Sequence, residues 1–203
     1  MLLSPLLLNM ELPPAIEALD RKITLALNGM HAPAMDTAMV FASDKHVWFP
    51  LYAVLIGWLI YLYRHRTWLL LPLLISAVAL ADTITSRLFK PFFGRLRPCH
   101  DALLQPLLHL PDGCGGQFGF LSSHAANSFA LATFLLLVLP RGRYRWVKGA
   151  FLLWAAVLSF SRVYLGAHYL TDVLGGILIG TLLATVAARV FLRYGPRWQN
   201  PKP

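Results

Sequence analysis

The sequence predicts an all-α fold, a polytopic bundle of transmembrane helices. The chain of 203 residues is 57% hydrophobic and only 13% charged, whereas about a quarter of the residues of an ordinary soluble domain are charged. Its mean hydropathy is +0.59. Several apolar runs approach the ~20 residues that a helix needs to cross the hydrocarbon core of a bilayer. A membrane protein with one helical domain is therefore expected.

The formal charge of +9 is at first sight typical of a nucleic-acid-binding protein. The basic residues, however, lie mostly in the short connections between apolar runs. Membrane topology and phosphate binding explain that distribution better. We therefore expect the lipid bilayer and a membrane lipid as partners, and no nucleic acid. The sequence leaves the oligomeric state open.

Residues 1–33 are expected to form an interfacial amphipathic segment. Pro13 and Pro14 precede a helical pattern that Asn28 and Gly29 close. Acidic and basic side chains within this helix make it too polar to cross a membrane, so it is expected to lie in the interface. Its apolar positions are Ile16, Leu19, Ile23 and Leu27.

Residues 34–194 form the predicted transmembrane domain, with five spans, or six if the N-terminal segments also cross. A shorter apolar stretch, Met35 to Ala42, is expected to pack on the core or to dip into the membrane. Residues 195–203 are polar and rich in proline, which predicts a disordered tail. The five spans are expected at about Val47–Tyr63, Trp68–Leu88, His124–Leu139, Trp146–Ser161 and Thr171–Phe191.

Individual residues predict where the second span ends and how the fifth span packs. Pro91 is expected to end the second span because it cannot donate a backbone hydrogen bond. Asp82, near the same end, is expected to face the protein interior and to pair with a cation or a hydroxyl. Gly175, Gly176 and Gly180 give the fifth span a small-residue face that allows close helix contact.

Alternation of the spans places the connections 88–123 and 162–170 on one side of the membrane. Basic residues outside these connections lie mostly on the other side, so the positive-inside rule puts 88–123 outside the cytoplasm. We expect a bacterial inner membrane protein whose functional side faces the periplasm. The basic residues of the cytoplasmic side are Arg64, Arg66, Arg141, Arg143, Arg145, Lys148, Arg189, Arg193, Arg197 and Lys202.

Both cysteines, Cys99 and Cys114, lie in the connection 88–123. In an oxidising compartment they can form a disulfide around a loop of about 16 residues, which contributes about 3 kcal/mol in the chain-entropy model. Two unrelated thiols are an equally supported alternative. A zinc site completed by His100 and His109 is disfavoured because its spacing matches no common ligand pattern.

A basic cluster, 90–98, follows the second span. Lys90 supplies a point charge and Arg97 a planar fork, and the two can converge on one phosphate group. The alternative is a set of basic residues anchored at the level of the lipid headgroups. Arg95 is expected to be such a snorkelling residue.

A second polar cluster opens the third span. A helix N-terminus offers free amides and a positive dipole end to an anion. Ser122 and Ser123 add hydroxyl groups, and one of them is expected to cap the helix. His124 would stand beside the bound anion and can donate a proton to a leaving oxygen. The alternative is a capped helix with an interfacial histidine.

The third cluster, 161–172, precedes and enters the fifth span. Arg162 supplies a second guanidinium, His168 a nucleophile and Asp172 a carboxylate. If the chain turns helical near His168, Asp172 lies one turn ahead on the same face. There it can hold one imidazole nitrogen and leave the other free to attack. The alternative is a histidine–aspartate bond that only tightens a turn, but three such clusters on one membrane face favour a phosphate-handling site.

Together the clusters resemble the three-part signature of the type 2 phosphatidic acid phosphatase superfamily, which includes vanadium-dependent haloperoxidases. Residues 90–98 have the form K-x6-R-P and 161–172 the form S-R-x5-H-x3-D, while 121–124 is a degenerate P-S-G-H. Leu121 replaces the usual proline and Ser123 the usual glycine. In segment order the resemblance extends over most of 35–193.

This resemblance implies a metal-independent phosphatase without a cofactor. His168 would attack phosphorus and form a phosphohistidine, and Asp172 would hold its ring. His124 would protonate the departing oxygen and then activate water. The oxygens of the phosphate would be bound by Lys90, Arg97, Ser122, Ser123 and Arg162.

The expected function is dephosphorylation of a membrane lipid. Hydrolysis of undecaprenyl pyrophosphate to undecaprenyl phosphate is favoured, because that carrier is recycled on the outer face and the compact chain resembles bacterial phosphatases of this kind. Phosphatidylglycerophosphate, phosphatidic acid and lipid A are alternatives. A phosphate-binding transporter, from a different class, would need Lys90, Arg97 and Arg162 but not the pair formed by His168 and Asp172. A haloperoxidase would need a soluble shell that this apolar chain does not provide.

Overall fold

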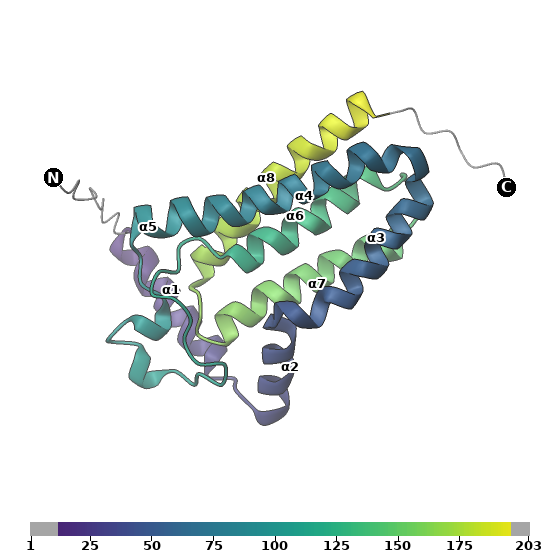
Figure 1. Cartoon of the computed structure of the whole chain (residues 1–203). Helices are drawn as coiled ribbons and strands as arrows, with labels where there is room; N and C mark the ends of the chain where they lie inside the picture. The colour runs from purple at the N-terminus through teal and green to yellow at the C-terminus, as the bar shows by residue number, and fades with distance from the viewer. Residues whose placement is uncertain (1–11, 196–203) are drawn as a thin grey trace.

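The computed structural model describes residues 12–195, and the regular elements of that range are helices (Figure 1). The predicted all-α fold is confirmed. The sole β-type pairing among the described residues is an isolated bridge between Leu96 and Phe118. The main helices are α1 (Pro14–Asn28), α2 (Pro33–Ser43), α3 (Phe49–Tyr63), α4 (Thr67–Thr83), α5 (Lys90–Phe93), α6 (Ser123–Val138), α7 (Arg145–Tyr164) and α8 (Leu170–Tyr194).

Within residues 12–195, three helical stretches are long and apolar enough to cross a membrane: Lys45–Phe93, Arg145–Tyr164 and Leu170–Tyr194. The first contains α3 and α4, which form two arms that meet at a short 3-10 turn, Arg64–Arg66 (Figure 1). Helix α6 is apolar but has only 16 residues. A helix therefore occupies each of the five positions at which the sequence predicts a span.

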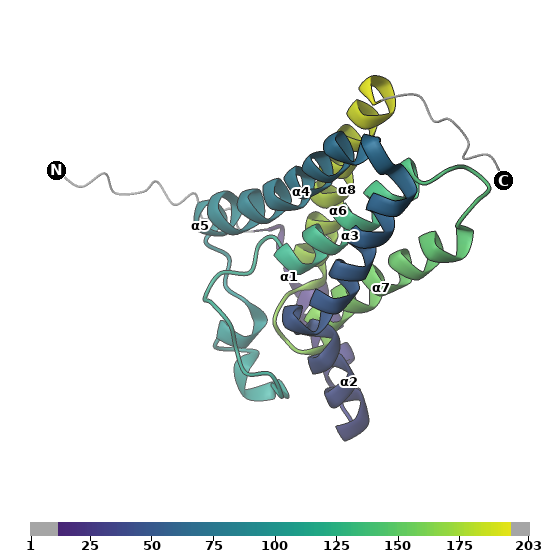
Figure 2. The same cartoon turned by 45° about the vertical axis from the view of Figure 1, so that its right-hand side comes forward.

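Helix α6 lies at the centre of the bundle, between α4, α7 and α8 (Figure 2). Its contact with α8 depends on glycine, as the sequence predicts. A Cβ atom at Gly180 would lie 2.0 Å from the carbonyl oxygen of Ala126, and one at Gly176 would lie 2.4 Å from that of Ser122. Because the two backbones approach this closely, the first turn of α6 lies beside the first turn of α8.

The second predicted span continues past Pro91, so the predicted end is wrong. Helix α4 passes into a π-helical stretch, Ile84–Phe89, and then into α5, which ends at Gly94 in the left-handed conformation. Pro91 stands in the first turn of α5. A missing N–H costs little in a first turn, and π turns locally relax the regular hydrogen-bond pattern. Lys90 therefore lies on a helix and is positioned by it.

Helix α7 also extends beyond its predicted end. It continues through Arg162 to Tyr164, and α8 begins at Leu170. The hydroxyl of Ser161 donates to the carbonyl of Leu158 at 2.7 Å, within the helix. The connection between the two helices is therefore only five residues, 165–169.

Helix α1 turns its polar face toward the protein. Asp20, Thr24 and Asn28 are buried, whereas Ile16 and Leu19 are exposed. An apolar outer face suits contact with lipid, and the interfacial position of residues 1–33 stays a prediction. Residues 1–11 and, apart from Gly195, the predicted tail lie outside the described residues.

Helix α2 lies against α7, so the apolar stretch Met35 to Ala42 packs on the protein. Met39 is buried against Tyr164 and Leu165. The hydroxyl of Tyr164 donates to Asp36 at 2.6 Å, and His109 from the long connection contacts the other oxygen of that carboxylate at 2.8 Å. Helix α2 thereby ties the end of α7 to the connection between α5 and α6.

Candidate active site

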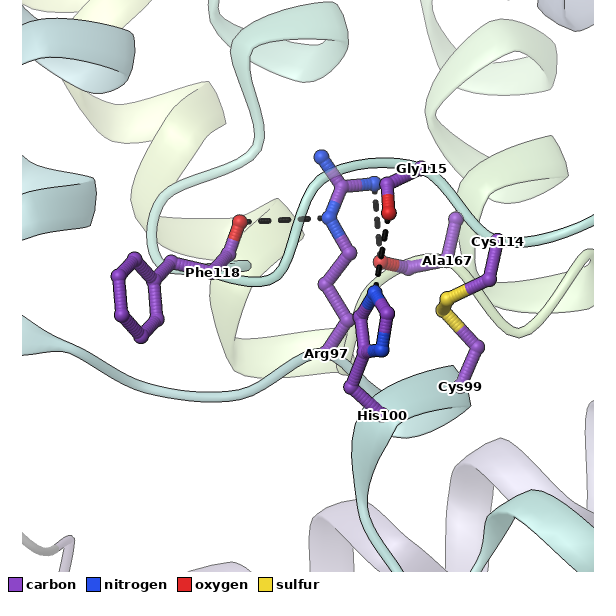
Figure 3. The surroundings of a disulfide bond; sticks show 7 residues. All are labelled: Arg97, Cys99, His100, Cys114, Gly115, Phe118 and Ala167. Atoms are coloured by element: carbon purple, nitrogen blue, oxygen red, sulfur yellow. Dashed lines mark hydrogen bonds between the residues drawn. A yellow bond between two sulfur atoms is a disulfide. The ribbon is translucent and has the colours of Figure 1, made fainter.

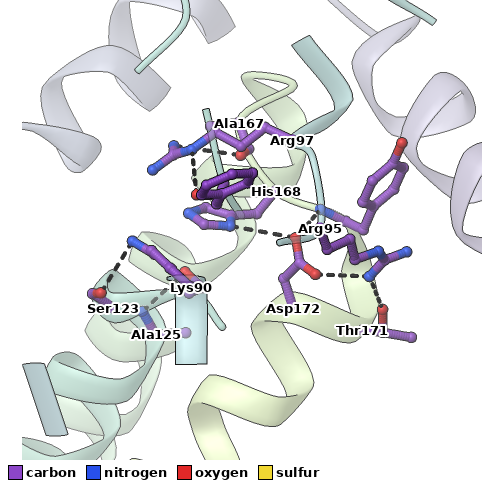
Figure 4. Close-up of polar contacts among 12 residues, drawn as sticks. Lys90, Arg95, Arg97, Ser123, Ala125, Ala167, His168, Thr171 and Asp172 are labelled. Carbon is purple, nitrogen blue, oxygen red and sulfur yellow. Dashed lines mark hydrogen bonds and ion pairs between the residues drawn. The ribbon is translucent and has the colours of Figure 1, made fainter. Parts of the chain in front are cut away.

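The three polar clusters predicted from the sequence meet at one end of the bundle (Figure 4). They come from α5 and the loop after it, from the start of α6, and from the α7–α8 connection. His124 and His168 each lie within electrostatic range of Lys90, Arg97 and Arg162. The end of the bundle opposite to them holds the turn 64–66 and the C-terminal end of α8 (Figure 1).

His168 faces Asp172 at the base of this site. The two side chains are 1% and 0% exposed, and Nδ1 of the imidazole lies 3.5 Å from Oδ2 of the carboxylate. His168 precedes α8 rather than lying in it: Tyr169 is the N-cap, and its backbone N–H donates to Asp172 Oδ2 at 3.0 Å. This capping contact fixes the carboxylate on the Nδ1 side, so Nε2 is the nitrogen left to meet a substrate.

Burial lowers the pKa of His168 well below its ordinary value of 6.5. The positive charges of Arg97, Arg162 and Lys90 act in the same direction. The imidazole is therefore neutral at physiological pH, which is the form a nitrogen nucleophile requires.

Arg162 shapes the turn that presents His168. Its carbonyl oxygen accepts the backbone N–H groups of Ala167 and His168, both at 3.0 Å. Its guanidinium is buried, donates to the hydroxyl of Ser43 and lies 3.8 Å from Asp112. The residue thus combines a role in backbone geometry with a cation close to both histidines.

Lys90 reaches from α5 to the first residue of α6. Its ammonium group donates to the hydroxyl of Ser123 at 3.3 Å, and the oxygen of that hydroxyl lies 2.8 Å from the hydroxyl oxygen of Thr85. The single hydroxyl proton of Thr85 is donated to the helix carbonyl of Ala81 at 2.8 Å. Ser123 therefore donates to Thr85 and accepts from Lys90. Ser123 stands where the motif usually has glycine, so this hydroxyl is an addition to it.

Arg97 is a second cation within electrostatic range of His168. It is 9% exposed, and its Nε donates to the carbonyl of Phe118 at 3.2 Å while Nη1 approaches the carbonyl of Ala167 at 3.5 Å. These two carbonyls leave further guanidinium donors for a ligand. The main-chain carbonyls therefore fix the Nε and Nη1 side of the guanidinium.

Ser122 is the N-cap of α6, as the sequence predicts for one of the two serines. Its hydroxyl accepts the N–H of Ala125 at 3.5 Å and is fully buried. A contact of that hydroxyl with phosphate stays a prediction. His124 follows in the first turn of α6 and is half-buried, a position that can meet both solvent and a bound group.

Comparison with known proteins decides the family. Residues 68–196 match the family model of the PAP2 superfamily. The chain belongs to the PAP2 superfamily. It is 37% identical over 168 residues to the lipid A 4'-phosphatase of Bacteroides thetaiotaomicron, covering 80% of this chain and 72% of that one. It is 30% identical over 183 residues to the lipid A 4'-phosphatase of Porphyromonas gingivalis, covering 88% and 75%.

The fold agrees with a solved PAP2 structure. The transmembrane PAP2-type phosphatidylglycerolphosphate phosphatase of Bacillus subtilis superposes with a TM-score of 0.67 at 26% identity, over 92% of this chain and 90% of that one. The three predicted motifs of this PAP2 chain therefore lie on a helix bundle of the family's kind.

Arg95 of the PAP2 site is not a snorkelling residue, so that expectation is wrong. Its guanidinium donates to Asp172 at 2.7 Å (Figure 4), and it also donates to Asp20 of α1 at 2.8 Å. Two buried carboxylates attract it more strongly than lipid headgroups could. Asp20 lies about 150 residues before Asp172 in the sequence, and the acidic residue of an amphipathic helix carried no signal that it reaches the site.

Cys99 and Cys114 form a disulfide beside this site (Figure 3). It closes the loop that follows Arg97, and His100 contacts the carbonyl of Gly115 across it at 3.0 Å. The zinc alternative is wrong, because oxidised cysteines offer no thiolate and His109 is engaged with Asp36. Cys99, Cys114 and His100 do lie together, but the disulfide explains why.

Asp82 is exposed rather than turned inward, which corrects the sequence-based expectation. Its carboxylate accepts a hydrogen bond from the side-chain amide of Asn127 at 3.0 Å. It also acts electrostatically on Lys90. Asp82 therefore lies at the rim of the PAP2 site, where it joins α4 to α6.

Proposed function

We propose that this chain, a membrane lipid phosphatase of the PAP2 superfamily, releases phosphate from a lipid headgroup through a phosphohistidine on His168. One observation carries the proposal. A buried, neutral imidazole faces the carboxylate of Asp172 with Nδ1 and lies among three cations, Lys90, Arg97 and Arg162. A nucleophile with an orienting carboxylate is what covalent catalysis needs, and clustered cations suit a transferring phosphoryl group.

In the first step, Nε2 of His168 attacks phosphorus and forms an N–P bond as the bond between phosphorus and the lipid oxygen breaks. His124 gives its proton to that oxygen, so the lipid leaves as a neutral alcohol, or as the shorter phosphate if the substrate is a pyrophosphate. The carboxylate of Asp172 stabilises the positive charge that develops on the imidazole.

In the second step, a water molecule loses a proton to His124 and attacks phosphorus. The N–P bond breaks, inorganic phosphate leaves and His168 returns to its neutral form. Lys90, Arg97 and Arg162 neutralise the phosphoryl oxygens in both steps. No metal ion takes part in this sequence.

The substrate we propose is lipid A, cleaved at its 4'-phosphate. Both curated relatives reported above are lipid A 4'-phosphatases. Phosphatidylglycerophosphate is the second candidate, supported by the similarity to the Bacillus subtilis enzyme. Undecaprenyl pyrophosphate, the substrate favoured on sequence grounds, is not singled out by these relatives.

We also propose that the site faces away from the cytoplasm of a bacterial membrane. The opposite end of the bundle carries the basic residues near Arg64, Arg143 and Arg193, which the positive-inside rule assigns to the cytoplasm. The disulfide at the site end supports this orientation, because disulfides persist in oxidising compartments.

The test is phosphate release by the purified full-length chain in detergent with EDTA. The panel contains lipid A, phosphatidylglycerophosphate, phosphatidic acid and undecaprenyl pyrophosphate. Release that persists in EDTA, is lost in His168→Ala and is kept in His65→Ala, an exposed histidine at the other end, supports the mechanism. The lipid from which phosphate is released fastest identifies the substrate.

Two results would refute the proposal. One is no release from any lipid by folded wild-type protein, which would favour a phosphate-binding transporter. The other is an unchanged rate in His168→Ala.

A further inference from the structure

A buried ionic bridge joins α1 to the catalytic carboxylate. The guanidinium of Arg95 donates through Nη1 to Asp172 Oδ1 at 2.7 Å and through Nη2 to Asp20 Oδ2 at 2.8 Å. The side chains of Arg95, Asp20 and Asp172 are 12%, 2% and 0% exposed. Such charge-assisted contacts are short, directional and hard to replace once water is excluded.

The same bridge also holds the start of α8. Asp20 Oδ1 accepts the backbone N–H of Thr171 at 3.1 Å, and its other oxygen accepts the Thr171 hydroxyl. Arg95 donates to that hydroxyl at 2.7 Å, and its guanidinium carbon lies 4.2 Å from the centre of the Tyr169 ring. Thr171, the residue directly before Asp172, is therefore tied to α1 through Arg95 and Asp20, and the ring of Tyr169 packs on the same arginine.

Each oxygen of Asp172 has a separate task. Oδ1 binds Arg95, while Oδ2 accepts the N–H of Tyr169 and faces the imidazole of His168. Rotation of the carboxylate about its own axis is thereby blocked from both ends. The orientation of His168 depends on Asp172, so it depends in turn on Arg95.

Arg95 differs from the cations assigned to phosphate. Its terminal nitrogens are both engaged by protein oxygens, from Asp172, Thr171 and Asp20. Arg97, by contrast, uses only main-chain carbonyls of its own surroundings. Arg95 is thus committed to the support of the site rather than to the substrate.

We propose that Arg95 and Asp20 are positioning residues that hold Asp172, and through it His168, in the geometry for attack, so that α1 is part of the catalytic centre. This inference rests on the proposed function. In this proposal the polar face of α1 supports the active site through Asp20, and the apolar side chains Ile16 and Leu19 are exposed on the outside.

The experiment is a double-mutant cycle in the full-length protein with Arg95→Gln, Asp20→Asn and the double variant. Misplacement of a catalytic group by about 1 Å can cost on the order of 100-fold in rate, so Arg95→Gln should lower kcat by tens of fold or more with KM for the lipid little changed. Asp20→Asn should lower kcat in the same way but less. The double variant should resemble Arg95→Gln alone, because both residues act through one bridge.

A second readout separates support from direct binding. Inhibition by inorganic phosphate should be as strong in Arg95→Gln as in the wild type, and should weaken in Arg97→Gln.

Matched variants keep the test falsifiable. Lys22→Gln removes an exposed charge from α1 and should leave kcat unchanged. Arg95→Lys, which keeps the charge and favours folding, should retain activity between wild type and Arg95→Gln because an ammonium lacks the fork that spans two carboxylates.

Three results would overturn the inference while the wild type is active: an unchanged kcat in Arg95→Gln, fully additive effects of the two substitutions, or phosphate inhibition weakened as in Arg97→Gln. An inactive wild type would overturn the proposed function as well.

Discussion

The backbone amide of Ser122 donates to the backbone carbonyl of Asp172 at 3.0 Å. This bond joins the cap of α6 to the first turn of α8, so the second and third motifs are held together by main chain. This hydrogen bond can form only because Gly176 and Gly180 allow α6 and α8 to approach closely. The relative position of His124 and His168 therefore depends on helix packing as well as on the motifs themselves.

Gly180→Ala should destabilise the protein. The added Cβ would lie 2.0 Å from the carbonyl oxygen of Ala126 and must force α6 and α8 apart, and overpacking of this kind costs about 2 kcal/mol. Thermal unfolding in detergent measures the loss. Gly149→Ala in α7 is the matched control, because its Cβ meets nothing within 4 Å and alanine favours the helix. Equal unfolding temperatures for the two variants would contradict this account.

Gly119→Ala should reduce activity more than stability. Its Cβ would lie 2.9 Å from Asp172 Oδ2 and 3.2 Å from Arg97 Cγ, so both side chains must move. We expect kcat to fall by on the order of 10- to 100-fold. Steady-state phosphate release measures the effect, with Gly116→Ala in the same loop as the control, since nothing lies within 4 Å of its Cβ. A fully active Gly119→Ala would show that this carboxylate has room to move.

Reduction of the disulfide between Cys99 and Cys114 should lower the free energy of unfolding by about 3 kcal/mol in the chain-entropy model. The bond follows Arg97 by two residues, so activity should fall as well because the arginine loop loosens. Thermal unfolding and phosphate release, each with and without reductant, measure both effects. The variant that carries Cys99→Ser and Cys114→Ser should not respond to reductant. An equal response in that variant would mean that reductant acts elsewhere.

Stability should fall as the pH drops below about 6.5, and His168 should account for part of the loss. Burial first, and nearby cations second, hold its pKa well below 6.5 in the folded chain. The unfolded chain takes up a proton near pH 6.5 that the folded chain refuses. The stabilisation is therefore complete above that pH and lost below it, by up to about 1.4 kcal/mol per pH unit.

Unfolding temperatures between pH 5 and pH 8 measure this slope. His168→Asn should flatten it, whereas His65→Asn, exposed at the opposite end, should not. A slope unchanged in His168→Asn would show that other groups carry the acid sensitivity.

Periodicity and composition were sufficient for the positions of the helices, because long apolar runs have few alternatives in a membrane. The prediction that the second span ends at Pro91 was wrong, because the π-helical stretch before this proline lets the helix continue. The prediction that Arg95 is a snorkelling residue was also wrong, because its neighbours in the sequence include no carboxylate. Asp20 supplies one from a helix far away in the chain.

The sequence by itself determined the membrane-embedded helical class, the three motifs and the candidate roles of His168, Asp172 and His124. The motifs could be found because each is defined by residue types at a fixed, short spacing along the chain. Only the tertiary structure decided which groups support that chemistry: the disulfide, the contact of Lys90 with Ser123 and the bridge from Asp20 through Arg95 to Asp172. Contacts between residues this distant in the chain follow from helix packing, and packing depends on the shapes of all the helices at once.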